Sequence, residues 1–105
     1  MLNDNGKSNI AKELKNLVEK DLGITKRALD KVKIIAPAKS YVRKIADDFL
    51  EMAQAYYKDA LHFKEKNDFI RAVACVNYAH AWLDAGARLG VFDVGEDDKL
   101  FTLAE

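Results

Sequence analysis

The chain has 105 residues, of which 50% are hydrophobic and 32% are charged, and its formal net charge is zero. This length suits a single domain that buries roughly 65% of its unfolded surface and needs no disulfide or metal site to be stable. The single cysteine, Cys75, excludes an internal disulfide framework. No apolar run reaches the roughly 20 residues of a membrane span, and the first residues lack the apolar segment of a signal peptide. We therefore expect a cytoplasmic protein that does not enter a membrane.

The charge is unevenly spread along the chain. Residues 1–39 carry nine Lys or Arg against five Asp or Glu, whereas residues 67–105 carry three against seven. Residues 40–66 balance at five each. Opposite charge at the two ends of a small protein can steer self-association. A bundle that packs the first and last thirds side by side compensates the same charges, and we favour this second interpretation.

The first predicted element is a long amphipathic helix over residues 8–34. Ser8 is a candidate N-cap, and apolar residues then recur every three or four positions. Asp21 is the exception, because it falls within the apolar stripe. Pro37 pushes Ala36 out of helical geometry and predicts the first turn.

Two further helices are predicted after this turn. Residues 40–66 have the cleanest separation of an apolar and a charged face in the chain, which is typical of an amphipathic helix. Asn67 and Asp68 turn the chain, and one of them is expected to cap a third helix over residues 68–89. Gly90 is then a suitable C-terminal stop.

Three helices of similar length joined by short turns predict an all-α fold, an antiparallel up-down three-helix bundle formed as one domain by residues 1–105. Residues 90–105 form a short C-terminal tail. The tail is too apolar for a segment in free solution. Its apolar residues are Val91, Phe92, Leu100, Phe101 and Leu103. We expect the tail either to fold back over the third helix or to dock on another chain.

The third helix carries one unusual row of polar residues. Asn77, His80, Asp84 and Arg88 follow one another at spacings of three and four in an otherwise apolar segment. Asp84 can hydrogen-bond to His80 one turn away and fix its ring. The pair then forms either a general-base dyad, for which no nucleophile is present, or part of a buried polar network completed by Asp21, Arg88 or a tyrosine. We favour the network.

Other chemistry is weakly indicated. Asp59 and His62 have the spacing of helical metal ligands, but they fall on the solvated side of the second helix and lack the second pair that di-iron bundles use. The lysines of the first helix alternate with acidic residues and lack an aromatic platform for stacking bases, which disfavours nucleic-acid binding. We expect no catalytic residue, metal or cofactor.

A family resemblance is carried by the runs SYVRKIADDFLEMAQAYYKDALHF, NDFIRAVACVNYAHAWLDAGARLGVFDV and DDKLFTLAE. The chain resembles the archaeal domain-of-unknown-function family number 357 from about Leu17 to Leu103. The resemblance implies a small, cytoplasmic, archaeal helical bundle and implies no reaction. The family motif falls on Asn77, Tyr78, His80, Trp82, Asp84 and Gly86. With Arg88 from the polar row, the candidate binding residues are Asn77, Tyr78, His80, Trp82, Asp84 and Arg88.

The leading functional hypothesis is a non-catalytic protein-interaction or assembly module rather than an enzyme, because the third helix has too little polar surface for a solvated side. The competing hypothesis is an RNA-associated or hydrolytic bundle that uses His80 and Asp84. We favour a homodimer over a monomer. The surface for self-association would be formed by Ala74, Tyr78, Ala81, Trp82 and Leu89. In the rival account the tail covers this surface within one chain.

Overall fold

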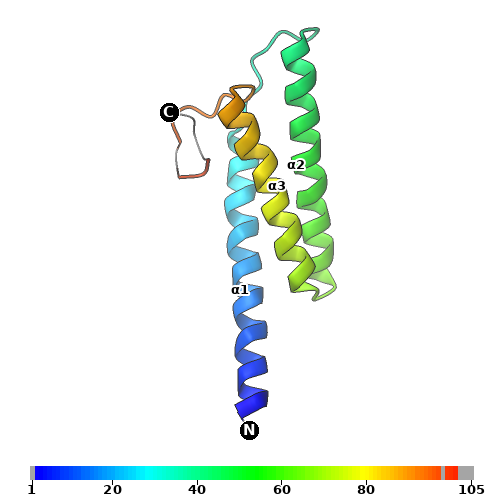
Figure 1. The fold of residues 1–105 in the computed structure, drawn as a ribbon, viewed down its shortest axis with the longest axis vertical. Helices are drawn as coiled ribbons and strands as arrows, with labels where there is room; N and C mark the ends of the chain where they lie inside the picture. The colour runs from blue at the N-terminus through cyan, green and yellow to red at the C-terminus, as the bar shows by residue number, and fades with distance from the viewer. Residues whose placement is uncertain (1, 98, 102–105) are drawn as a thin grey trace.

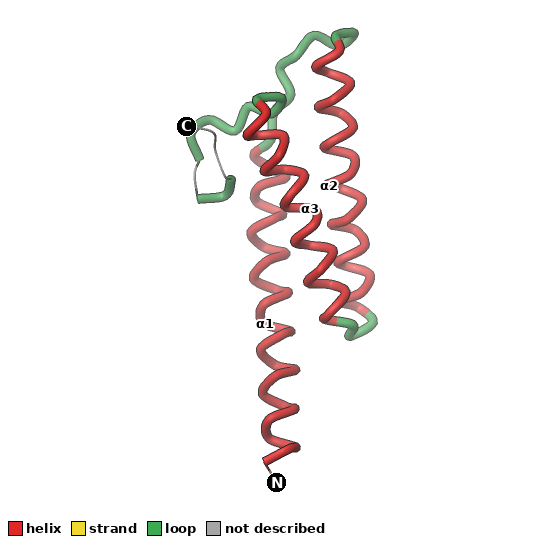
Figure 2. The backbone as a smooth tube through the Cα atoms, viewed as in Figure 1, coloured by secondary structure: helices red, strands yellow, loops and turns green. Residues whose placement is uncertain are grey.

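Three helices run up, down and up along the long axis of the molecule (Figure 1). The computed structural model of the protein describes residues 2–97 and 99–101, with side chains from residue 9 onward. The helices are α1 (Leu2–Lys31), α2 (Tyr41–Glu65) and α3 (Phe69–Leu89). A long loop joins α1 to α2 and a short turn joins α2 to α3 (Figure 2). The described residues contain no strand, and the prediction of an all-α antiparallel three-helix bundle is confirmed.

The start of α1 differs from the predicted range of 8–34. The helix already includes Leu2, so Ser8 lies inside it and the prediction that Ser8 caps the helix is wrong. The amino-terminal half of α1 extends past the turn between α2 and α3 (Figure 1). Ile10 and Leu17 on this half keep 60% and 43% of their surface exposed. One end of α1 therefore lies outside the bundle.

The end of α1 also differs from the prediction, because the helix stops at Lys31 rather than at residue 34. The next residues pair with the C-terminal tail: the Lys33 N–H donates to the Asp93 carbonyl at 3.1 Å, and the Asp93 N–H donates to the Lys33 carbonyl at 2.8 Å. Val32 and Ile34 pack against the core on either side of this pairing. Both residues therefore reach the core from beyond the end of the helix.

Local hydrogen bonds define the ends of α2 and α3 where the sequence predicts them. The Ser40 hydroxyl accepts a hydrogen bond from the Arg43 N–H at 3.1 Å and caps α2. Asp68 caps α3, since its carboxylate accepts from the Arg71 N–H at 3.1 Å. At the other end of α3, Gly90 takes a left-handed conformation with φ of 88°. The caps predicted at Asp68 and Gly90 are confirmed.

α3 packs against both other helices and supplies much of the core. Small residues dominate the α2–α3 contact and allow the two backbones to approach closely. The buried residues of α2 are Ala46, Ala53 and Ala60. The buried residues of α3 are Ala72, Val76, Ala79, Leu83 and Gly86.

The tail folds back onto the bundle, which is the first of the two expected arrangements. Val91, Phe92, Val94 and Phe101 keep only 7%, 3%, 4% and 3% of their surface exposed. They join Ala28 of α1 and Leu83 of α3, among others, in one core cluster. Leu103 lies outside the described residues. The tail therefore completes the core at the end of the bundle where α1 stops.

Gly86 is the point at which the tail crosses α3. A Cβ atom at this position would overlap the ring of Phe92. The Gly86 carbonyl also accepts hydrogen bonds from the backbone N–H groups of Gly90, Val91 and Phe92, at 3.1, 3.0 and 3.3 Å. The position therefore needs glycine because of this close approach, and not because of its backbone conformation.

Asp97 holds the far end of the tail. Its carboxylate accepts hydrogen bonds from the N–H groups of Leu100 and Lys99, both at 3.1 Å, and lies 3.5 Å from the ammonium of Lys31. The hydrogen bond from the Leu100 N–H, assisted by those from Lys99 and Lys31, holds the pKa of Asp97 below its usual value. The carboxylate form is thus the one that supports the docked tail.

The first prediction concerns Gly86. We expect Gly86→Ala to lower the free energy of unfolding by about 1–3 kcal/mol, because the new methyl displaces the Phe92 ring. Gly23→Ala is the matched control: its Cβ would meet nothing closer than the Arg27 guanidinium at 3.8 Å, so helix propensity should make it neutral or stabilising. Urea unfolding followed by circular dichroism measures both. Equal stability of the two variants would contradict the close packing of the tail.

The second prediction concerns acid. The pKa of an aspartate in an unfolded chain is about 3.9, and the pKa of Asp97 in the folded protein is lower than the usual value. Its contribution to stability is therefore present above about pH 4 and is lost as the pH falls through the folded-state pKa. We expect the free energy of unfolding by urea to fall between about pH 6 and about pH 2.5 in both proteins, and to fall less in Asp97→Ala than in the parent. An unchanged acid response would show that Asp97 does not hold the tail.

Candidate functional site

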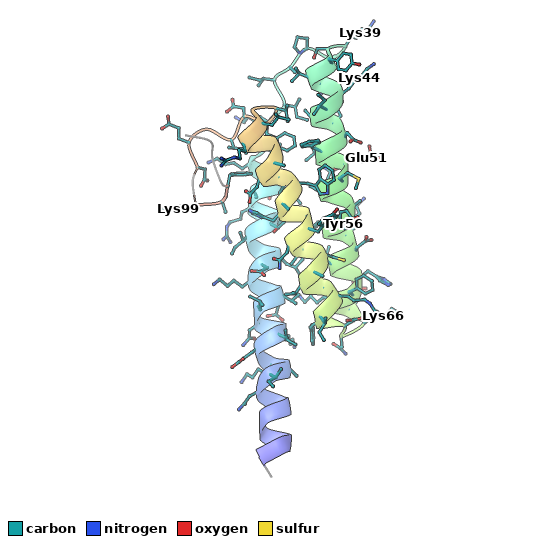
Figure 3. All side chains as sticks on the ribbon, viewed as in Figure 1. Lys39, Lys44, Glu51, Tyr56, Lys66 and Lys99 are labelled. Carbon is teal, nitrogen blue, oxygen red and sulfur yellow. The ribbon has the colours of Figure 1, made fainter. Side chains whose placement is uncertain are left out.

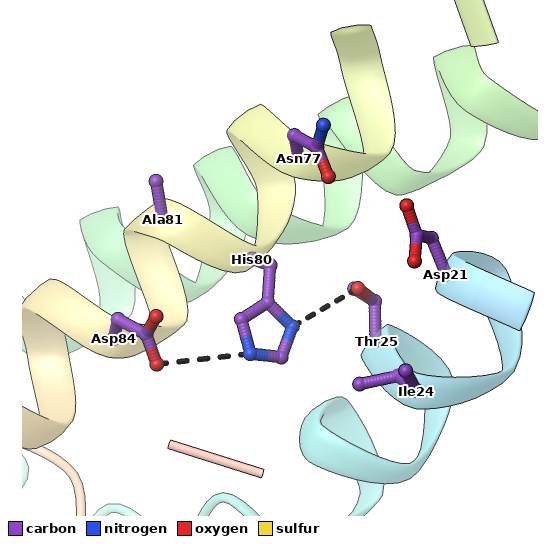
Figure 4. Close-up of a pocket in the computed structure, with 7 residues that line it drawn as sticks. All are labelled: Asp21, Ile24, Thr25, Asn77, His80, Ala81 and Asp84. Carbon is purple, nitrogen blue, oxygen red and sulfur yellow. Dashed lines mark hydrogen bonds and ion pairs between the residues drawn. The ribbon is translucent and has the colours of Figure 1, made fainter. Parts of the chain in front are cut away.

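The polar row of α3 borders a groove between α3 and α1 (Figure 4). The groove has a volume of about 340 Å³. Its lining residues are Asp21, Ile24 and Thr25 from α1 and Asn77, His80, Ala81 and Asp84 from α3. Three of the candidate residues are thus brought together on one wall. Asp21, the exception in the apolar stripe of α1, lies on the opposite wall.

His80 joins three parts of the chain. Its Nδ1 lies 3.0 Å from the Thr25 hydroxyl on α1, and its Nε2 lies 2.7 Å from the Leu100 carbonyl in the tail. A carbonyl only accepts, so Nε2 carries the hydrogen. In the neutral ring Nδ1 then accepts from the hydroxyl of Thr25, which is only 2% exposed. The ring therefore links α1, α3 and the tail through both of its nitrogen atoms.

Asp84 has a smaller role in orienting this ring than its spacing predicts. Its Oδ1 lies 3.7 Å from His80 Nε2, which exceeds hydrogen-bond range but allows an ion pair when the ring is protonated (Figure 4). The hydrogen bonds that fix the imidazole come from Thr25 and Leu100. The expectation that Asp84 fixes the ring is therefore wrong.

The two true partners of His80 gave little signal in the sequence. Thr25 belongs to the apolar stripe of α1, where the sequence predicts that a β-branched side chain packs in the core and gives no sign of a hydrogen bond to another helix. Leu100 contributes a main-chain carbonyl, and no residue pattern marks such a group. Only the fold of the tail places it beside the ring.

The expected buried network is formed only in part. Asn77 is exposed at the rim of the groove, and Asp21 is half-buried. The side chains of His80 and Asp84 are 21% and 30% exposed. The row is therefore the edge of a groove that solvent reaches, and His80 is the member that connects it to α1 and to the tail.

The aromatic candidates lie on another side of α3, next to α2. The Trp82 ring packs edge-on against Phe49 at 5.0 Å between centroids, and the Tyr78 ring packs edge-on against Tyr56 at 4.4 Å. Tyr78 and Trp82 also contact each other edge-on at 6.5 Å. The six candidate residues therefore do not form a single site.

The outer face of α3 is the name used below for the exposed apolar surface of this helix. It consists of the half-buried Trp82 and of the exposed residues Ile70, Ala74, Tyr78, Ala81, Ala85 and Leu89. Two shallow hollows of about 230 and 410 Å³ lie along it and share Ala85. Arg88, the last member of the polar row, lines the larger hollow with Phe49 of α2. Tyr78 and Leu89 remain 51% and 61% exposed, so the docked tail leaves this surface uncovered.

The chemical groups of the α1–α3 groove are suited to polar binding rather than to bond breaking. Both nitrogen atoms of His80 already have partners, which removes the free base that a dyad would need. Burial raises the pKa of the Cys75 thiol, so its nucleophilic thiolate form is disfavoured. Within the part of the chain that is described, no three His, Cys, Asp or Glu residues form a cluster that could hold a metal ion.

The third prediction tests the His80 link. We expect Thr25→Val to lower the free energy of unfolding by about 1–3 kcal/mol, since His80 Nδ1 loses its donor. His80→Phe should cost as much or more, and the double variant should be less damaging than the sum. Urea unfolding gives all three values. Additive costs of the two single variants would contradict the assigned hydrogen bonds.

Comparisons with known proteins identify the family. No curated protein and no solved structure matches the chain. No helix of the described residues is both long and apolar enough to cross a membrane. The family model described as "Protein of unknown function (DUF357)" matches residues 20–92, which include all of α2, α3 and the polar row. Because this match covers more than half of the sequence, the chain belongs to this family of proteins of unknown function.

Proposed function

We propose that the protein is a non-catalytic module for protein interaction and assembly in the archaeal cytoplasm, and that it self-associates as a homodimer. One observation carries the proposal: apolar surface stays open after the tail has folded back. Ile70, Tyr78 and Leu89 on the outer face of α3 are 70%, 51% and 61% exposed. A contiguous apolar surface of this kind is typical of a site that another protein covers.

The composition of the outer face suits a helix as partner. Tyr78 and Trp82 offer large, rigid rings, which are common anchors of protein interfaces. The exposed alanines between them allow a second helix to approach closely. These alanines are Ala74, Ala81 and Ala85. The aromatic neighbours on α2 widen the same surface.

The competing hypothesis of a hydrolytic or RNA-associated bundle has less support. Its proposed base, His80, donates to the Leu100 carbonyl and contacts the Thr25 hydroxyl. The described groove holds two carboxylates, Asp21 and Asp84, which would repel a phosphate backbone. An interaction module requires neither a free imidazole nor a basic surface.

The fourth prediction is a mass measurement. We expect sedimentation equilibrium of the full chain at tens of micromolar to give an average mass well above the 11.8 kDa of one chain, and filter binding to show no tight, salt-sensitive RNA affinity. A clean monomer would contradict self-association. Strong RNA binding that weakens with salt would instead favour the competing hypothesis.

The outer face itself is tested by comparing baits in a lysate of the source organism. Tyr78→Glu places a charge in the centre of the face, whereas Lys58→Glu changes the charge of an exposed residue on α2. Proteins that the parent and Lys58→Glu retain, and Tyr78→Glu loses, would identify partners of this face. Identical capture by all three baits would show that the outer face is not used.

A further inference from the structure

The exposed apolar residues on the outer face of α3 are spaced symmetrically along the helix. They are Ile70, Ala74, Tyr78, Ala81, Ala85 and Leu89, which are four, four, three, four and four residues apart. Steps of three and four residues keep all of them on one side of the helix. The pattern is the same in both directions from a centre between Tyr78 and Ala81. A face with this symmetry meets a second copy of itself with every position matched.

We propose that a second copy of the chain covers the outer face, with its α3 lying antiparallel about a two-fold axis between Tyr78 and Ala81. The proposal rests on the self-association proposed above and names the surface and the direction of the contact. The symmetry produces each contact across the axis twice. The residues that face each other are Tyr78 and Ala81, Ala74 and Ala85, and Ile70 and Leu89.

The sizes of the facing side chains are complementary. At the centre the ring of Tyr78 meets the small side chain of Ala81, and on either side an alanine meets an alanine, which allows the two backbones to approach closely. At the ends, Ile70 and Leu89 cover each other, and these are the two most exposed large side chains of the face, at 70% and 61%. A parallel pair would instead place the Tyr78 rings of both chains at one level, where they would hold the helices apart.

The two hollows of the outer face lie where the second copy supplies large side chains. The smaller hollow, of about 230 Å³, borders Ala81, which faces the partner's Tyr78. The larger hollow, of about 410 Å³, borders Leu89 and Phe49 of α2, and Leu89 faces the partner's Ile70. Each hollow therefore receives an apolar side chain, as the holes between packed helices receive the knobs of the facing helix.

α2 widens the contact on one side and holds its aromatic rings in place. Tyr56, which is labelled in Figure 3, packs edge-on against Tyr78 at 4.4 Å between ring centroids. The Trp82 ring is held in the same way by Phe49, at 5.0 Å. Because these rings are already ordered in one chain, little side-chain freedom is lost when a second chain binds.

Charges at the two ends of the face are compensated. The antiparallel arrangement brings Arg71 to the level of the partner's Arg88. Within its own chain Arg71 forms an ion pair with Asp68, whose carboxylate lies 2.7 Å from the guanidinium, and Arg88 also interacts within its own chain. The face therefore does not bring two uncompensated positive charges together.

The fifth prediction uses disulfides to test the position and direction of the contact. In a chain carrying Cys75→Ala, which removes the native thiol, we expect Ala74→Cys combined with Ala85→Cys to form a covalent dimer on mild oxidation, because these positions face each other across the axis. Each single variant is a matched control and should stay monomeric on a non-reducing gel. An antiparallel pair separates each position from its own copy by about 17 Å along the helix, which a disulfide does not span.

The possible outcomes separate this arrangement from self-association in general. A covalent dimer of either single variant would overturn the antiparallel direction, since a parallel pair brings each position against itself. If the double variant does not crosslink while sedimentation equilibrium shows a dimer, the outer face is not the contact and self-association stands. A parent chain that remains monomeric at tens of micromolar would refute both.

Opposite charges at the ends of the face test the same arrangement without a thiol. Ile70→Lys alone and Leu89→Glu alone should each weaken the dimer roughly tenfold in sedimentation equilibrium, because each places a charge against an apolar side chain. The double variant pairs the two charges across the axis and should dimerise more tightly than either single variant. Both positions are exposed in one chain, so circular dichroism of all three variants should match the parent. A double variant that dimerises no more tightly than the single variants would overturn the pairing of Ile70 with Leu89.

Discussion

α3 has too few polar side chains to keep a solvated side, and the rest of the protein is arranged around that constraint. α2 covers it through three buried alanines, α1 covers it at Thr25 and Val18, and the tail covers its last turns at Gly86. Burial of apolar surface is the main driving force for each of these contacts. What none of them covers is the outer face, where Tyr78 remains half exposed.

The tail is held by a small number of specific contacts that act together. Phe92 fills the space that Gly86 leaves open, and the Leu100 carbonyl accepts from His80. The Asp97 carboxylate accepts a hydrogen bond from the Leu100 N–H and forms an ion pair with Lys31, and in this way it joins the tail to the end of α1. Because His80 also contacts Thr25, the same ring fixes the position of α1 relative to α3. A residue that resembles a catalytic base from sequence alone is thus occupied by structural hydrogen bonds.

Much of the fold could be predicted because its determinants are local. Asp68 caps α3 through a hydrogen bond only three residues away, and Gly90 ends it through its own backbone conformation. The end of α1 could not be predicted, since it depends on pairing between Lys33 and the distant Asp93. The start of α1 was missed because Ser8 resembles a cap, although the helix runs through it.

The candidate site was predicted in composition but not in arrangement. The row of Asn77, His80 and Asp84 does border one groove. Helical spacing within a single segment gave no information about Thr25 or Leu100, which belong to other parts of the chain. The same spacing could not show that Tyr78 faces α2 instead of the groove.

The central claim is that a second copy of the chain covers the outer face of α3. Amide hydrogen exchange as a function of protein concentration tests it most directly. The account predicts that the amides of α3 around Tyr78, Ala81 and Ala85 become more protected as the concentration rises, while those of residues 10–17 of α1 do not change. Protection of this part of α3 that is the same at all concentrations would contradict it.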